Sequence, residues 1–116
     1  MITILPADKA TLALLDVPEG HEAMVLRESD GRITGHATFV LVDDTVELLT
    51  VTAEEPIMVD GLIRSVLNTG DCRGAVTGLC RDENLALTLR RLEFAPGENG
   101  YSVSLAHFFR GECHCK

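Results

Sequence analysis

One stretch of the sequence has the shape of an anion-binding site. Residues 45–67, "TVELLTVTAEEPIMVDGLIRSVL", run from a β-branched segment through an acidic turn at Glu54, Glu55 and Pro56 into residues at helical spacing. A strand that feeds a helix this directly presents the first unpaired N–H groups of the helix to a ligand. The turn contains no glycine and no basic residue, so its residue types oppose strong binding of a phosphate.

A second stretch, the end of the chain, has side chains suited to a soft metal. Cys113, His114 and Cys115 stand side by side, and His107 lies six residues before Cys113. Thiolates and imidazole are ligands for zinc or copper(I), but a CxC pair cannot fill a tetrahedral site. We predict zinc or another soft metal at Cys113 and Cys115, completed by His107, another cysteine or a second copy of the chain. The alternative is an inert, exposed terminus.

Composition limits the classes of function. The 116 residues are 46% hydrophobic, enough for one domain with a core. The 18 acidic and 10 basic side chains give a net charge of −8, which opposes binding to nucleic acid or to an anionic membrane. No apolar run approaches the roughly 20 residues that span a bilayer, and the first residues do not resemble a secretory signal. We therefore expect a cytoplasmic protein.

The first half of the chain predicts an antiparallel meander. Met1 to Leu5 indicates an edge strand, followed by a helix of about two turns. Asp30-Gly31 between extended runs is a strong hairpin signal, and Asp43-Asp44 indicates a second tight turn. The continuous apolar run from Phe39 to Val42 is typical of a strand covered on both faces, which requires helices on both faces of the sheet.

The second half predicts a βαβ crossover. An apolar stripe from Val59 to Leu67 indicates a helix over 57–69, and residues 75–80 return to extended character as a parallel strand. Asp82 can cap a second helix. The segment "EFAPGENGYSVSLAHFF" then closes with a hairpin that turns between Gly97 and Gly100. We expect a single domain over residues 1–110 and a separate tail over 111–116.

This order of elements resembles the GNAT superfamily of N-acetyltransferases. The resemblance lies in Leu48 to Thr52, which match the family's fourth strand, in Leu62 and Ile63 on the next helix, and in "NLALTLRRLEF", which is similar to the family's closing helix. It implies an α/β (α+β) fold with a mixed sheet, an antiparallel meander followed by a βαβ crossover, and helices on both faces. It also implies an acyl-CoA-dependent N-acyltransferase that acts on a small-molecule or peptide amine.

The resemblance also implies a set of site residues. Acetyl-CoA would be the co-substrate, with its pantetheine arm on the backbone of Thr50, Val51 and Thr52 and its phosphates near Ile57 and Val59. Glu47 would be the general base. The alternatives are a solvated carboxylate at Glu47 and ordinary sheet pairing at 50–52.

Several positions depart from the family's pattern. The family's phosphate-binding turn has a basic residue or glutamine followed by glycine or alanine, whereas this chain reads "EEPIMVDG". Each carboxylate close to a phosphate costs about 1 kcal/mol in water. Leu89 stands where the family usually has a tyrosine acid, and Tyr101 is a candidate replacement. The second hypothesis is therefore a non-catalytic GNAT-like domain that binds a partner surface or a metal, and a homodimer is left open.

Overall fold

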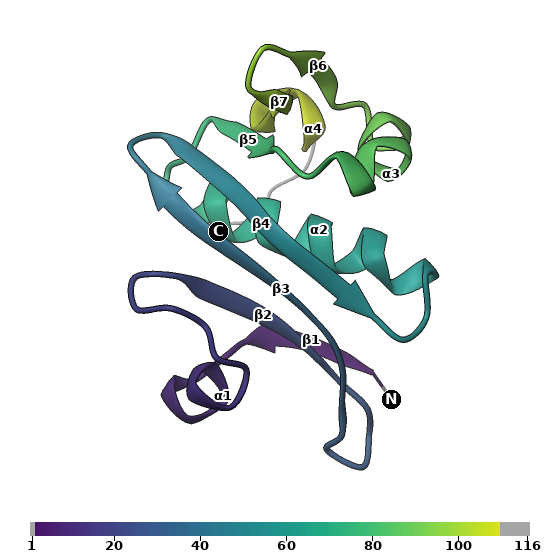
Figure 1. The fold of residues 1–116 in the computed structure, drawn as a ribbon. Helices are drawn as coiled ribbons and strands as arrows, with labels where there is room; N and C mark the ends of the chain where they lie inside the picture. The colour runs from purple at the N-terminus through teal and green to yellow at the C-terminus, as the bar shows by residue number, and fades with distance from the viewer. Residues whose placement is uncertain (1, 110–116) are drawn as a thin grey trace.

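The computed structural model describes residues 2–109, which form one seven-stranded sheet with helices on both faces (Figure 1). The sheet order is β1-β2-β3-β4-β5-β7-β6, and every neighbouring pair is antiparallel except β4 and β5. The strands are β1 Thr3–Pro6, β2 Glu22–Arg27, β3 Ile33–Val42, β4 Thr45–Ala53, β5 Thr77–Cys80, β6 Ala95–Gly97 and β7 Gly100–Ser104. The helices are α1 Lys9–Leu14, α2 Ile57–Cys72, α3 Ala86–Arg91 and α4 Leu105–Phe108, with a 3₁₀ turn at Glu83–Leu85.

The meander forms because its turns have residues that tolerate left-handed backbone conformations. Gly31, between β2 and β3, has a φ of 88°, and the N–H of Glu28 donates to the carbonyl of Arg32 at 2.9 Å. Asp43, between β3 and β4, has a φ of 55°, a conformation that aspartate tolerates better than most residues. Both predicted turns are confirmed.

The long helix α2 connects the parallel strands β4 and β5 and covers one face of the sheet. Its buried side is Leu62, Ile63, Val66, Leu67 and Gly70, as the three- and four-residue spacing predicts. The helix also contacts β2, where the hydroxyl of Thr69 lies 3.7 Å from the sulfur of Met24. The predicted helix over 57–69 and the parallel strand after it are confirmed, and the helix continues to Cys72.

Within the described part of the chain, the opposite face of the sheet has only the short helix α1 (Figure 1). Asp8 caps it, because the N–H of Thr11 donates to the Asp8 carboxylate at 2.8 Å, and this hydrogen bond lowers the pKa of Asp8. Thr11 is buried and accepts from Arg27 of β2 at 3.2 Å. Arg27 and Met24 have opposite parity along β2, so α1 and α2 cover opposite faces. Much of the α1 face therefore has no helical cover within residues 2–109.

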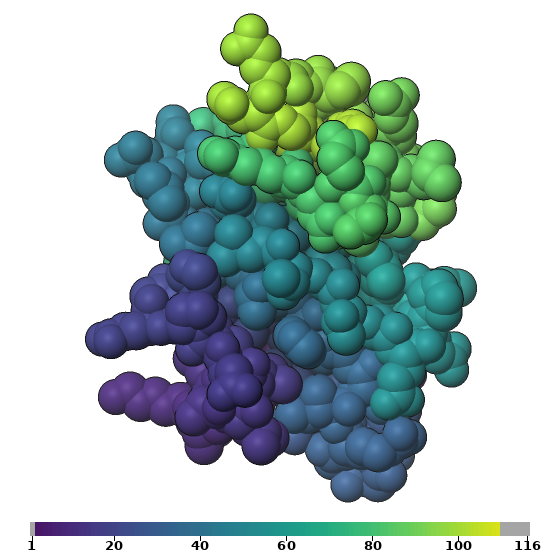
Figure 2. Space-filling view, viewed as in Figure 1, coloured from purple at the N-terminus to yellow at the C-terminus, as the bar shows by residue number. Residues whose placement is uncertain are grey.

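The C-terminal elements extend the sheet beyond β5 and form the upper part of the molecule in Figure 2. The predicted second helix appears as the 3₁₀ turn and α3, with Asp82 accepting from the N–H of Asn84 at 2.9 Å. The closing hairpin turns between Gly97 and Gly100 as predicted. Residues 105–108 were expected to continue that hairpin, which is wrong. They form α4, because the Ser104 hydroxyl accepts from the N–H of His107 at 3.4 Å and caps a helical turn.

No helix within residues 2–109 has both the length and the apolar character needed to cross a membrane.

Candidate functional site

The most distinctive feature of the sheet is a β-bulge at Leu49 in β4. Phe39 of β3 pairs with Leu48 and Thr38 pairs with Thr50, so Leu49 is an extra residue on β4. Strand β5 pairs with β4 only up to the pair Leu48–Cys80. The bulge thus lies at the point where β5 leaves β4, and the two strands separate beyond it (Figure 1).

This separation gives β4 an edge without a strand partner over residues 49–53 within the described part of the chain. The other edge of these residues pairs with β3. Main-chain N–H and C=O groups on such an edge need partners, and an extended ligand can supply them in the way that an added strand does. Thr50, Val51 and Thr52, which the GNAT resemblance assigns to a pantetheine arm, all lie on this edge.

The bulge also decides which side chains of β4 reach the open face, which is the face of the sheet opposite α2. Val46 and Leu48 are buried against α2, and after the extra residue Val51 packs against the same core. Thr50 and Thr52 are exposed and therefore lie on the opposite face. The hydroxyls of Thr50 and Thr38 lie 2.6 Å apart in a cross-strand hydrogen bond, which fixes a polar strip on the open face.

Glu47 lies on the same open face, because it precedes the buried Leu48 and side chains alternate along a strand. Its Oε2 is 3.4 Å from Nε of Arg81, which directly follows β5, and only 22% of its side chain is exposed. The carboxylate is thus held near the end of the paired segment of β4 and β5. Sequence reasoning selected Glu47, but it missed Arg81, because only the parallel pairing of β4 and β5 brings residues 34 apart together.

A groove of about 380 Å³ continues this open face toward α1. Its lining includes Leu14 and Leu15 at the end of α1, and His36 and Thr52 on the sheet. His36 pairs with Thr52 and so faces away from Phe39, as strict alternation along β3 predicts. Leu14 is 73% exposed, so the groove is mainly apolar, with His36 and Thr52 as polar side chains in its lining.

The turn before α2 lies where an anion could bind at a helix N-terminus, but not all of its N–H donors are free to bind one. The N–H of Met58 donates to the carbonyl of Glu55 at 2.9 Å, and that of Val59 donates to the carbonyl of Pro56 at 3.1 Å. Two of the helix N–H groups that an anion would need are therefore already used. Ile57, another predicted contact, is 79% exposed.

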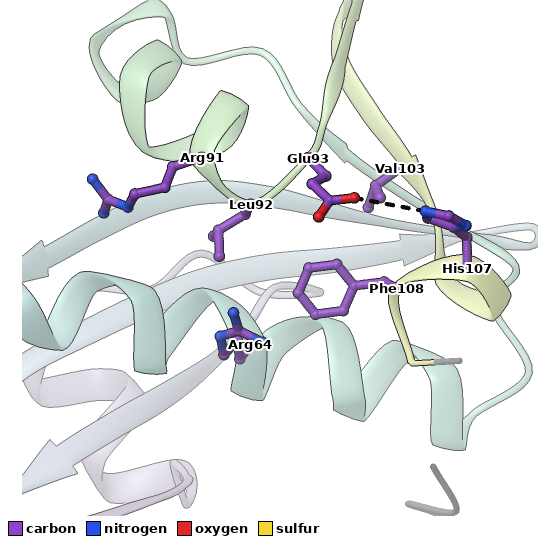
Figure 3. A pocket seen from close by; sticks show the side chains of 7 residues that line it. All are labelled: Arg64, Arg91, Leu92, Glu93, Val103, His107 and Phe108. Atoms are coloured by element: carbon purple, nitrogen blue, oxygen red, sulfur yellow. Dashed lines mark ion pairs between the residues drawn. The ribbon is translucent and has the colours of Figure 1, made fainter. Parts of the chain in front are cut away.

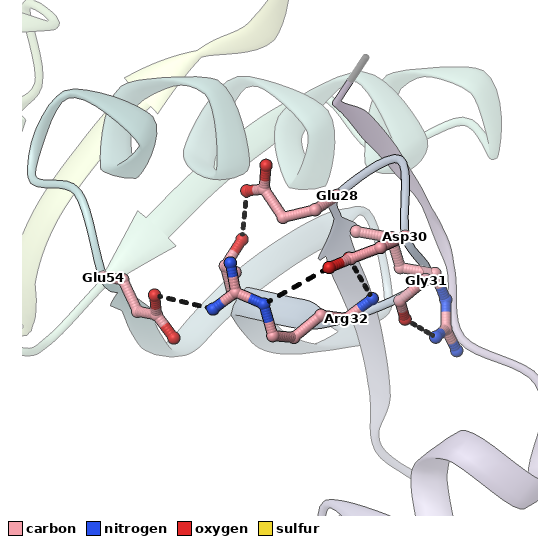
Figure 4. Close-up of polar contacts among 7 residues, drawn as sticks. Glu28, Asp30, Gly31, Arg32 and Glu54 are labelled. Carbon is pink, nitrogen blue, oxygen red and sulfur yellow. Dashed lines mark hydrogen bonds and ion pairs between the residues drawn. The ribbon is translucent and has the colours of Figure 1, made fainter.

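Acidic side chains surround this turn. Glu54 pairs with Arg32 at 3.5 Å, and Arg32 also lies 3.9 Å from Asp30 (Figure 4). Asp60, in the first turn of α2, pairs with Arg91 of α3 at 2.8 Å. Glu55 is exposed. A diphosphate placed here would meet like charge, so the phosphates of an acyl-CoA do not fit this turn.

Position 89, where the family usually has a tyrosine acid, has no acid side chain. Leu89 is fully buried in the core, which explains an apolar residue there. Tyr101 pairs with Cys80 across β5 and β7, is 6% exposed, and its hydroxyl donates to Glu83 at 3.3 Å. Tyr101 thus lies on the α2 face of the sheet, whereas Glu47 lies on the other.

Metal binding finds no support in the described residues. Within residues 2–109, no group of three or more histidine, cysteine, aspartate or glutamate side chains could hold a metal ion. The predicted ligands Cys113 and Cys115, and the tail 111–116, lie outside the described residues. His107, the predicted additional ligand, pairs with Glu93 at 3.7 Å.

The chain matches no protein-family model, and no curated protein matches its sequence. Solved structures do match its fold. The spermidine N-acetyltransferase of Vibrio cholerae has a TM-score of 0.71 at 9% identity, covering 96% of this chain and 98% of that one. The ribosomal-protein alanine N-acetyltransferase of Escherichia coli has a TM-score of 0.69 at 15% identity, covering 90% and 94%. A Desulfovibrio desulfuricans protein described as a GNAT-family acetyltransferase has a TM-score of 0.63 at 15% identity, covering 84% and 78%.

The chain therefore has the GNAT fold, as the resemblance implied. The antiparallel meander, the βαβ crossover and the helices on both faces are all confirmed.

Proposed function

We propose that the chain is an N-acyltransferase that moves an acyl group from an acyl-CoA thioester to an amine. One observation carries the proposal: the bulge at Leu49 opens the edge of β4 next to Glu47. The opening offers main-chain groups to a pantetheine arm, and those groups do not depend on side-chain identity. The similarity of fold to N-acetyltransferases supports the same reaction class.

The reaction needs one proton acceptor and one oxyanion donor. The amine nitrogen attacks the thioester carbonyl carbon, a C–N bond forms, the C–S bond breaks, and the thiolate leaves. Glu47 accepts the proton of the amine, directly or through a water molecule, because it is the carboxylate of β4 on the open face. A main-chain N–H of the exposed β4 edge stabilises the carbonyl oxygen as it becomes negative.

The acceptor amine would approach over the open face. The groove between α1 and the sheet is lined by apolar Leu14 and Leu15 and by Thr52 of β4. A primary amine on an apolar stem fits this groove, whether it belongs to a small molecule or to the end of a peptide. Glu54 lines the same groove and would favour a cationic amine.

The second candidate function is a binding domain without catalysis. The acidic turn favours it, because Glu55 and Asp60 oppose the phosphates of any CoA ester and the first α2 N–H groups are already bonded. Such a domain would bind a partner protein through the open face or a soft metal through Cys113 and Cys115. Zinc at the tail and a homodimer stay predictions.

Turnover and binding separate the two functions. The full chain is incubated with acetyl-CoA and a set of small-molecule and peptide amines, while release of the free thiol and the mass of the product are followed. We expect Glu47→Gln to lower kcat by about 10²-fold or more, with little change in acetyl-CoA binding. Glu98→Gln, in the exposed turn of the closing hairpin, is the matched control. If the wild-type chain neither binds acetyl-CoA in a calorimeter nor releases thiol, the N-acyltransferase proposal fails and the binding-domain function remains.

A further inference from the structure

A second pocket lies on the α2 side of the molecule, away from the open face that carries Glu47. It has a volume of about 190 Å³ between α2, the end of α3, β7 and α4 (Figure 3). Its lining comprises Arg64, Arg91, Leu92, Glu93, Val103, His107 and Phe108. The proposed acyl transfer uses none of these residues.

Arg64 is the central charge of this pocket. Its guanidinium lies 5.2 Å from the centre of the Phe108 ring, a cation–π contact that holds the group in place without neutralising it. Within residues 2–109, no carboxylate forms an ion pair with Arg64, whereas Arg32, Arg73, Arg81 and Arg91 each have at least one such partner. Its N–H donors are therefore available to a ligand.

The two arginines and the one carboxylate of the pocket are separated. Arg91 uses Nη2 for the ion pair with Asp60, which leaves its other donors available. In Figure 3 Arg64 and Arg91 lie to the left of the Phe108 ring, while Glu93 lies above the ring and points to His107 on the right. Glu93 is thus directed to the imidazole of His107, 3.7 Å away. The side of the pocket near Arg64 is positive in a chain whose net charge is −8.

The apolar floor strengthens the effect of this charge. Leu92 and Val103 are buried, with 4% and 6% exposure, and the Phe108 ring covers part of the pocket. Charges interact more strongly beside such low-polarity groups than in open water. Planar guanidinium groups match the oxygens of phosphate and carboxylate and bind them in bidentate geometry.

We infer that this pocket binds a small oxyanion of the phosphate class, with Arg64 as the principal contact and Arg91 as the second. The volume admits a phosphate group with a short substituent, and Phe108 and Leu92 would pack against that substituent. The site is distinct from the turn at 54–56, where carboxylates oppose anions.

Phosphate binding by the full chain tests the inference without reference to turnover. Inorganic phosphate is titrated in a calorimeter and in a thermal unfolding assay, against sodium chloride at matched ionic strength. We expect saturable binding by the wild type, and a loss of about tenfold or more in affinity for Arg64→Met, since a hydrogen bond to a charged group is removed. Arg64→Gln is a second variant in case the first folds poorly.

Arg90→Met is the matched control. Arg90 also lies over an aromatic ring, that of Tyr101 at 6.0 Å, but it does not line the pocket. The Arg90→Met variant should bind phosphate with the affinity of the wild type. Three results would overturn the inference: no saturable binding by the wild type beyond that of chloride, an Arg64→Met variant that binds as well as the wild type, or an equal loss in Arg90→Met.

Discussion

The backbone of Gly70 in α2 lies directly against the side chain of Val46 in β4. A Cβ placed on Gly70 would come within 2.6 Å of both Cβ and Cγ1 of Val46, a separation that real side chains do not reach. Val46 is fully buried at the start of the strand that carries Glu47. This contact therefore sets how closely α2 approaches β4.

Gly70→Ala should destabilise the protein in spite of alanine's higher helix propensity. The gain from propensity is at most about 1 kcal/mol, whereas overpacking at a rigid contact costs about 1–3 kcal/mol. Gly61→Ala is the matched control in the same helix, because its Cβ would meet only Cδ1 of Ile4 at 3.4 Å. Urea unfolding measures both. A Gly70→Ala variant as stable as Gly61→Ala would show that the helix can move away from β4 at no cost.

Deletion of Leu49 should preserve the fold and abolish binding at the β4 edge. Without the extra residue, Leu48 and Val51 still face the core and Thr50 still faces the open side, so β4 becomes a regular strand. The bend that separates β4 from β5 is then lost. Cooperative unfolding reports the fold, and calorimetry reports acetyl-CoA binding.

Leu49→Ala is the control for that deletion, because it keeps the bulge and removes only the side chain. It should bind acetyl-CoA as the wild type does. If the deletion variant and the wild type bind acetyl-CoA equally, the opened edge is not the pantetheine site.

Neutralising the acidic turn should strengthen the binding of acetyl-CoA. Removing one carboxylate near a phosphate gains about 1 kcal/mol, which is roughly fivefold in affinity. Glu55→Gln should have the larger effect, because the charge of Glu54 is partly offset by Arg32 at 3.5 Å. The double variant should show the greatest gain at low salt. Tight binding by the unmodified chain, or no gain in any variant, would place the phosphates elsewhere.

Cys80 should be an unreactive thiol that makes the protein less stable at alkaline pH. It is fully buried, and burial raises the pKa of its thiol above the ordinary 9.0. Above pH 9 the unfolded chain releases this proton more readily than the folded chain, so this contribution to stability is complete below pH 9 and declines as the pH rises toward the folded pKa.

Mass spectrometry of the alkylated protein checks the reactivity of Cys80, which should be modified far more slowly in the folded than in the unfolded state. Unfolding curves at several pH values check how the free energy of unfolding depends on pH. Cys80→Ala should weaken the alkaline decline, whatever it does to stability at pH 7. Fast alkylation of the folded protein at Cys80 would contradict its burial.

Much of the fold could be predicted because it depends on local patterns. Residues close together in the sequence set the turns at Asp30-Gly31 and Asp43-Asp44. The same holds for the apolar stripe of α2. The alternation along β4 also contains a sign of the bulge, since apolar residues occupy 46 and 48 and then 49, 51 and 53. This change of parity at Leu48-Leu49 indicates one extra residue in the strand.

Other features were not predicted. Helix α4 was missed because "SLAHFF" is apolar enough for a strand, and the cap at Ser104 decided the outcome. The partner of Glu47 was missed because Arg81 comes near it only through the pairing of β4 with β5. The pocket at Arg64 was missed for a similar reason, since its residues come from α2, α3, β7 and α4.

The sequence by itself determined most of the elements, the meander, the crossover and the acidity of the turn before α2, because short-range periodicity, capping and charge follow from neighbouring residues. The tertiary structure alone decided that β5 leaves β4 beside the bulge, that Glu47 meets Arg81, and that Arg64 lies over Phe108 without a carboxylate partner within residues 2–109. These relationships join residues tens of positions apart, and the packing that sets them depends on the whole sheet rather than on any one segment.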